Sequence, residues 1–231
     1  MNKSLTQLAV AILISTSLAA CGGGTSQGHG GPPMIVNEDG TSTFDSTQLG
    51  TNLASLPIEA LNEAETASLT YLREEEKLAL DVYTQLDSIW GASIKVFGNI
   101  AKSEATHTET VRQLLLRYNL TDPSVNLGSG RFVNATLQGL YDSLVSQGTT
   151  SLSAALQVGA AIEEIDIVDI RNALVGIDNQ DIRLVYDNLE KGSRNHLRAF
   201  VKNLDQQGVT YSPQYLDADA YNAIISTPTE R

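Results

Sequence analysis

Two histidines and three glutamates lie at positions where helices would direct them toward one interior. Of the three histidines in the chain, His107 and His196 fall on the apolar stripes of long predicted helices. Glu104 precedes His107 by three residues, so both side chains can reach the same point. Glu76 and Glu163 lie on the stripes of two further predicted helices. Because buried carboxylates are costly unless they are paired or bind a metal, the set predicts a metal site within a bundle.

The elements that would position these residues are four long segments with the 3.6-residue periodicity of amphipathic helices. The first two meet at a short joint, as do the last two, and about thirty residues with a short helical run separate the pairs. Two antiparallel hairpins joined by one long crossover is the ferritin-like order, so we expect an all-α, ferritin-like four-helix bundle. The expected helices span about 58–90, 94–118, 151–174 and 181–204, with the short one near 135–145.

The ligand from the first helix is chosen among three adjacent glutamates. A stripe through Glu74 would bury Lys77 or Asp81, which argues against it. A stripe through Glu75 is only slightly more polar than the stripe through Glu76. Glu76 is therefore favoured narrowly, and Glu75 stays open as the alternative.

The third helix offers two adjacent glutamates. A stripe through Glu164 would bury Gln157 and Arg171, whereas the stripe through Glu163 buries apolar residues. The periodicity therefore favours Glu163 and leaves Glu164 as the alternative.

The order of these residues resembles that of the ferritin-like di-iron proteins, which include bacterioferritin and rubrerythrin. Their pattern is Glu, Glu-x-x-His, Glu, Glu-x-x-His, and it maps onto Glu76, onto Glu104 with His107, onto Glu163 and onto His196. A tyrosine seven residues after the first Glu is also typical, and the chain has Tyr83 there. The stretches 73–83, 99–107 and 192–200 look more closely like a bacterial ferritin-like family catalogued only as a domain of unknown function. The resemblance, over about 69–204, implies a fold and a metal site but no substrate.

The last motif departs from the family pattern. Three residues before His196, where the pattern has Glu, the chain has Ser193, a poor ligand for a divalent ion. A water could fill the gap, Asp166 could reach in from one turn beyond Glu163, or only one metal could bind well. Oxygen and imidazole ligands without thiolate suit iron, manganese or zinc, and the ferritin-like resemblance favours iron or manganese.

The N-terminus predicts export and a lipid anchor. Lys3 is followed by an apolar run too short to span a bilayer, and Leu18-Ala19-Ala20-Cys21 resembles a bacterial lipobox with Cys21 as the lipidated residue. Cys21 is the only cysteine, so no disulfide within the chain can use it. We expect a signal peptide (1–20), Cys21 with a flexible Gly/Ser/Pro tether (21–57), the bundle (58–206) and a C-terminal tail (207–231).

Charge restricts the partners. The net charge of −12 argues against nucleic acid and suits attraction of cations. The sequence predicts an envelope protein, lipid-anchored at the outer membrane, that binds one or two metal ions and is a candidate oxidoreductase for ferrous iron, oxygen or peroxide. The alternative is a non-catalytic tethered binding module whose bundle holds a structural metal or none. Membrane contact is expected through the lipid alone, and a homodimer is compatible with the sequence.

Overall fold

The computed structural model describes residues 32–37 and 39–231, and this part of the chain is mostly helical. The all-α prediction is confirmed, with one short β-hairpin added among the described residues. In the same part of the chain, no helix is long and apolar enough to cross a membrane. The predicted signal peptide (1–20) and Cys21, the predicted site of lipidation, lie outside the described residues, as does His29, the third histidine of the chain.

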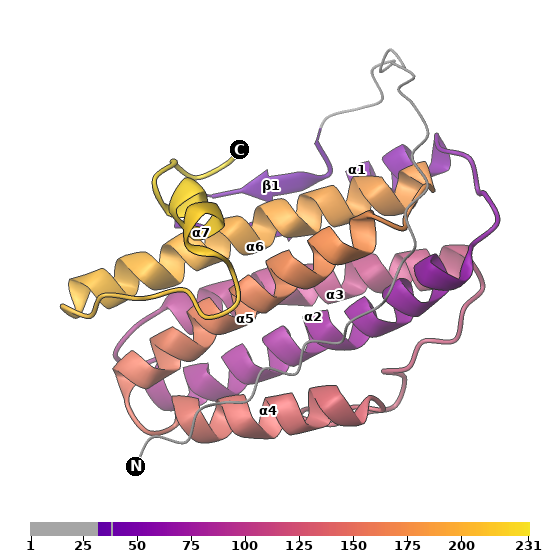
Figure 1. Ribbon diagram of the computed structural model, residues 1–231. Coiled ribbons are helices and arrows are strands. Elements are labelled where there is room, and N and C mark those ends of the chain that lie inside the picture. Colours follow the sequence, from indigo (N-terminus) through magenta and orange to yellow (C-terminus); the bar gives the residue numbers. More distant parts are fainter. Residues whose placement is uncertain (1–31, 38) are drawn as a thin grey trace.

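Four long helices form the body of the molecule: α2 (Glu63–Trp90), α3 (Val96–Arg117), α5 (Leu152–Leu174) and α6 (Gln180–Gln206). Helix α2 packs mainly on α3 and α5 mainly on α6, and the two pairs meet through α2 with α5 and α3 with α6 (Figure 1). The connection between the pairs carries α4 (Ala135–Gly148), which lies along α2 and α5. The predicted helices and the long connection are therefore present.

A capping box sets the start of α2. The Asn62 side chain accepts a hydrogen bond from the Glu65 amide, and the Glu65 carboxylate accepts one from the Asn62 amide, each at 2.9 Å. Glu65 also accepts the backbone amides of Asp178 and Asn179 in the α5–α6 joint. The capping box provides partners for backbone amides that have no acceptor within the first turn. Helix α2 therefore begins at Glu63 rather than near residue 58.

The segment before α2 differs from the flexible tether that the composition suggests. It forms the antiparallel strands β1 (Met34–Val36) and β2 (Ser42–Phe44) and then helix α1 (Ser46–Ala54). Strand β2 contacts α3 and α6. Four large apolar residues of this stretch are buried, which supplies hydrophobic free energy that the prediction of a tether overlooked: Met34, Phe44, Leu49 and Leu53.

The C-terminal tail is also folded. Helix α7 (Ala218–Ile225) packs on α6. Beyond it, Glu230 accepts hydrogen bonds from Arg194 and Arg198 of α6. Residues 207–231 thus cover one side of the α5–α6 pair.

The core has two apolar clusters separated along the bundle by a polar layer. On α2, for example, Leu72 belongs to one cluster and Leu78 to the other. On α3 the change falls between Ile100 and Val111, and on α6 it falls between Leu189 and Leu197. Glu76, Glu104, His107 and His196 lie in these intervals, whereas Glu163 on α5 lies between Ile162 and Ile167, which both belong to the cluster of Leu78.

Candidate metal centre

The centre of the polar layer is formed by Glu104 and His107 on α3 and by His196 on α6. One ligand atom of each lies within 4.8 Å of the others. The carboxylate of Glu104 faces both rings, with Oε2 3.1 Å from His107 Nδ1 and Oε1 2.8 Å from His196 Nδ1. The imidazoles stack with their centroids 5.3 Å apart and their planes 16° from parallel. The Glu104 carboxylate therefore faces the Nδ1 atoms of two nearly parallel imidazoles.

Two further carboxylates extend this group on either side. Oε2 of Glu76, on α2, lies 3.6 Å from His107 Nδ1. Oε2 of Glu163, on α5, lies 3.5 Å from His196 Nδ1. The structure thus brings all five sequence-predicted residues together, as two Glu–His pairs that share Glu104.

The carboxylates of this layer lack hydrogen-bond donors although they are almost completely buried. Glu76, Glu104 and Glu163 are each 1% exposed or less. Glu76 Oε1, both oxygens of Glu104 and Glu163 Oε2 have no hydrogen-bond partner within the described structure, and neither has His196 Nδ1. Buried polar atoms of this kind usually have a partner, so these atoms require a proton on the facing imidazoles, a cation or water.

Other buried glutamates show the opposite condition. Glu74 accepts the amides of Val133 and Asn134, which start α4. Glu164 accepts the Tyr211 hydroxyl and the backbone amides of three consecutive residues, Gln214, Tyr215 and Leu216. These two carboxylates are fully used by the fold, whereas those facing the histidines are not.

Glu76 and Glu163 are the residues beside the histidines, as predicted. However, the arguments against Glu74 and Glu164 assumed that the polar faces of their helices would stay exposed, and this assumption is wrong. The face of α2 with Glu74 does bury Lys77 and Asp81, because the crossover covers it: Lys77 binds Asp81 and the Gly128 carbonyl. Glu164 is buried because the C-terminal segment covers it. The periodicity of a single helix cannot show such covering segments.

Electrostatics couple the residues of the centre. Burial alone would raise the pKa of Glu104, but the adjacent imidazoles hold it well below its usual value. Burial would lower the pKa of both histidines, yet the facing carboxylates raise it to about 10 for His107 and about 9 for His196. Burial raises the pKa of Glu76 to about 7 despite the opposing attraction of His107. A divalent cation would replace the protons that this group otherwise holds.

Tyr83 orients one of the carboxylates. Its hydroxyl, on α2, donates to Glu163 Oε1 at 2.6 Å, and it also lies 3.2 Å from the Gly159 carbonyl. Glu163 Oε2 is left facing His196. The tyrosine that the family resemblance singled out is therefore a partner of a carboxylate of the centre.

Ser193 does not take the place of the missing glutamate. Its hydroxyl donates to the Leu189 carbonyl of its own helix at 3.2 Å. Asp166, by contrast, is 2% exposed, and burial together with the nearby carboxylates of Glu75 and Glu163 raises its pKa well above the usual value. The structure thus adds a fourth buried carboxyl group beside the centre.

Glu75 faces away from the histidines. Both of its oxygens are buried without a hydrogen-bond donor among the described residues, and burial and the Asp169 carboxylate raise its pKa well above the usual value. A carboxyl group in this environment favours its protonated form. Glu76, and not Glu75, lies beside His107.

Sequence reasoning missed Ser42, which is buried against the outer side of the centre. Its hydroxyl oxygen lies 3.1 Å from His107 Nε2 and 2.9 Å from His196 Nε2. Ser42 comes from strand β2, 65 residues before His107, and no periodic pattern marks it. The signal that could have raised attention is Gly192, the single glycine of α6, one turn before His196.

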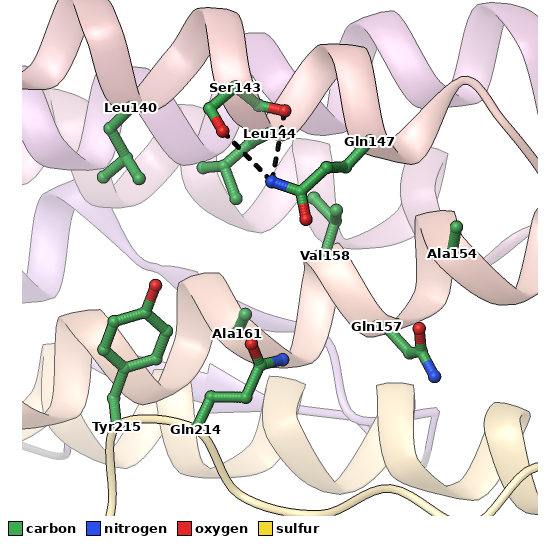
Figure 2. A pocket seen from close by; sticks show the side chains of 10 residues that line it. All are labelled: Leu140, Ser143, Leu144, Gln147, Ala154, Gln157, Val158, Ala161, Gln214 and Tyr215. Atoms are coloured by element: carbon green, nitrogen blue, oxygen red, sulfur yellow. Dashed lines mark hydrogen bonds between the residues drawn. The ribbon is translucent and has the colours of Figure 1, made fainter. Parts of the chain in front are cut away.

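A surface pocket lies elsewhere, between α4, α5 and the segment that follows α6 (Figure 2). It has a volume of about 160 Å³, and its lining includes Leu140, Gln147, Val158 and Tyr215 but none of the residues of the centre. Figure 2 shows uncharged side chains around it, with the Gln147 amide bound to Ser143. The pocket lacks titratable groups other than a tyrosine, so it offers no comparable chemistry.

The helical fold and the buried Glu/His layer define an all-α protein with a candidate metal centre. Residues 65–228 match the family described as "Uncharacterized protein domain (DUF2202)", and the chain belongs to this family. It is 47% identical over 179 residues to "Uncharacterized protein MJ0754" of Methanocaldococcus jannaschii, an alignment that covers 78% of this chain and 96% of that one. The crystal structure of hypothetical protein MJ0754 from Methanococcus jannaschii is similar, with a TM-score of 0.73 at 47% identity, and the match covers 76% of this chain and 99% of that one.

Proposed function

We propose that this protein is a ferritin-like four-helix-bundle protein that binds two divalent ions, iron or manganese, in the polar layer. The observation that carries the proposal is the convergence of three buried carboxylates, with oxygens that lack donors, on the Nδ1 atoms of two parallel histidines. Burying several carboxylates without a compensating cation costs several kcal/mol per ion. Zinc also fits oxygen and imidazole ligands.

The arrangement suits two ions. Glu76 with His107 would hold one ion and Glu163 with His196 the other, while Glu104 has one oxygen toward each histidine and would bridge them. Three glutamates supply three negative charges against the four positive charges of two divalent ions. A fourth carboxylate from Asp166 would complete the balance in place of the glutamate that Ser193 replaces.

The burial of the centre limits what can react there. Its five residues are at most 1% exposed, so only species as small as a metal ion, dioxygen or peroxide suit the site. A bound redox-active pair would supply one-electron transfers, and the reduction of peroxide to two waters would need two electrons and two protons. The chain's residues hold the carboxylates in place, through Tyr83 for Glu163, and exclude bulk water.

We further propose that the protein acts in the cell envelope, anchored through a lipid on Cys21. The support is the lipobox-like Leu18-Ala19-Ala20-Cys21 and the single cysteine. The negative net charge suits collection of cations near the surface.

Elemental analysis tests the metal proposal. The chain would be purified without a metal-affinity tag and compared with the double variant His107→Ala, His196→Ala. We expect two iron or manganese ions per chain, absent from the double variant. Metal-free protein after reconstitution with ferrous iron and with manganese would refute the proposal.

The alternative function is a non-catalytic binding module in which the metal is structural. The near-complete burial of the centre, remote from the surface pocket, favours it over an enzyme with a large substrate. Oxygen or peroxide consumption with ferrous iron distinguishes the two. Turnover that Glu104→Ala abolishes supports the oxidoreductase, whereas a metal that raises the melting temperature without turnover supports the binding module.

A further inference from the structure

Ser42 contacts both histidines of the centre through one atom. Its side chain is completely buried, and its Oγ lies 3.1 Å from His107 Nε2 and 2.9 Å from His196 Nε2. Because Nδ1 of each ring faces Glu104, Nε2 of each ring points to the opposite side, where Ser42 lies. Ser42 is outside residues 65–228, which match the family.

The fold holds Ser42 in this place from several directions. Its backbone amide donates to Ser103 Oγ of α3 at 3.0 Å. The turn before it uses Gly40 at φ +87°, a left-handed conformation that favours glycine, and a Cβ there would lie 3.0 Å from Ala199 Cβ of α6. The hairpin therefore rests on both helices that carry the histidines.

Gly192 provides the space for the contact. A Cβ at this position would lie 2.9 Å from Ser42 Oγ and 2.8 Å from His107 Cε1, closer than carbon atoms approach in proteins. Phe44, two residues after Ser42, packs its ring edge-on to His107 with the centroids 5.7 Å apart. Ser42, Gly192 and Phe44 therefore pack closely against the side of the imidazoles that faces away from Glu104.

A serine hydroxyl has one proton and two acceptor lone pairs, so it can accept hydrogen bonds from two N–H groups at once. A histidine that binds a metal through one ring nitrogen usually donates the N–H of the other nitrogen to a nearby acceptor, which fixes the tautomer and the ring orientation. One oxygen within 3.1 Å of both Nε2 atoms fits the role of common acceptor.

We propose that Ser42 is the positioning residue of the metal centre: its single hydroxyl accepts a hydrogen bond from Nε2–H of His107 and of His196. Both rings then direct the Nδ1 lone pair toward Glu104. This inference rests on the proposed function, because the lone pairs are aimed at a metal. The same oxygen serves both rings, so its loss weakens both halves of the centre together.

The test compares Ser42→Ala with Ser193→Ala in the full chain. Ser193 is a matched control because it is another buried serine beside the histidines, but its hydroxyl binds the Leu189 carbonyl. Zinc is the probe, since it is diamagnetic, and its Kd is measured by competition with a chromogenic chelator. We expect the Kd of Ser42→Ala to rise about 10- to 100-fold and that of Ser193→Ala to stay within about twofold of the unaltered chain.

Nitrogen-15 NMR of the histidine side chains supplies a second readout, with and without zinc. In the unaltered chain we expect two slowly exchanging Nε2–H protons, and in the zinc-loaded form two zinc-bound Nδ1 atoms. Both Nε2–H protons should exchange faster in Ser42→Ala. The fluorescence of Trp90, at the far end of α2, reports whether each variant is folded.

Each outcome is decisive. Zinc binding that Ser42→Ala weakens no more than Ser193→Ala overturns the positioning role and leaves the metal proposal standing. A ring whose Nε2 lacks a proton in the zinc-loaded chain also overturns it, because Ser42 would then donate to that ring. Failure of the unaltered chain to bind zinc, iron or manganese overturns the proposed function and this role together.

Discussion

The division of the centre into two Glu–His pairs that share Glu104 makes a prediction about the number of ions bound. Glu76→Gln removes a carboxylate from one pair and Glu163→Gln from the other, whereas Glu104→Gln removes the group that faces both histidines. We therefore expect two ions in the unaltered chain, one in each of the first two variants and none in Glu104→Gln.

The magnitude follows from binding linkage. An ion that binds only the folded state adds about 2.7 kcal/mol of unfolding free energy at a free concentration of 100 Kd. Two ions would add about 5 kcal/mol, and at about 2–4 °C per kcal/mol the melting temperature would rise by roughly 10–20 °C. Each single-pair variant should retain about half of that rise, and Glu104→Gln should retain almost none of it.

Calorimetry with and without added metal measures this rise, and elemental analysis of the same samples counts the ions. Comparing each variant with its own metal-free form removes any effect of the substitution on the metal-free fold. Glu164→Gln is the control, because Glu164 is equally buried but accepts only donors of the C-terminal segment. It should lower the baseline melting temperature and leave the rise unchanged. Two ions retained in Glu104→Gln would refute the division into two halves.

Three further substitutions follow from single contacts. Asp166→Asn should reduce the metal content from two ions to one if this carboxylate completes the charge balance; an unchanged content in elemental analysis would contradict that role. Tyr83→Phe leaves Glu163 Oε1 without its 2.6 Å donor, so urea unfolding of the metal-free chain should show a loss of about 1–3 kcal/mol. Arginine contacts lower the pKa of Glu230 to about 2 despite partial burial, so its stabilisation is present above about pH 4.5 and is lost as the pH falls through 2. After allowance for solvent screening, Glu230→Gln should therefore lose about 1 kcal/mol at pH 7, and urea titrations should show that this difference shrinks below pH 4.

The four long helices and the five residues of the centre could be predicted from the sequence, because both predictions depend on short-range periodicity. An i, i+3 pair such as Glu104 and His107 faces one direction whatever surrounds the helix. The connectivity could also be predicted, from the short joint at Gly91 and from the roughly thirty residues of sequence that separate the two helix pairs. These signals are local, so a single sequence contains them.

The segments that cover the bundle could not be predicted in the same way: residues 32–57, the crossover between the helix pairs and the C-terminal segment. The composition of residues 32–57 suggested a tether, but the stretch is folded, and several of its few large apolar residues, such as Phe44 and Leu49, are buried. The burial of Glu74 by the crossover and of Glu164 by the C-terminal segment depends on contacts across about 50 residues of sequence or more. Such contacts leave no period in the sequence, and Ser42 escaped notice for the same reason.

The distribution of hydrogen-bond donors distinguishes structural carboxylates from candidate ligands better than burial does. Glu65, Glu74 and Glu164 are as buried as the glutamates of the centre, but the fold directs backbone amides at each of them. Glu76 and Glu104 have no such amides, although Glu76 lies in the same helix as the satisfied Glu65 and Glu74. If all these buried glutamates had a purely structural role, we would expect each carboxylate to accept hydrogen bonds from backbone amides. Donors are missing for the carboxylates that face the two imidazoles and also for the neighbouring Glu75, whose raised pKa favours its protonated form. The convergence of unsatisfied oxygens on imidazole nitrogens is therefore the physical basis for placing a cation there.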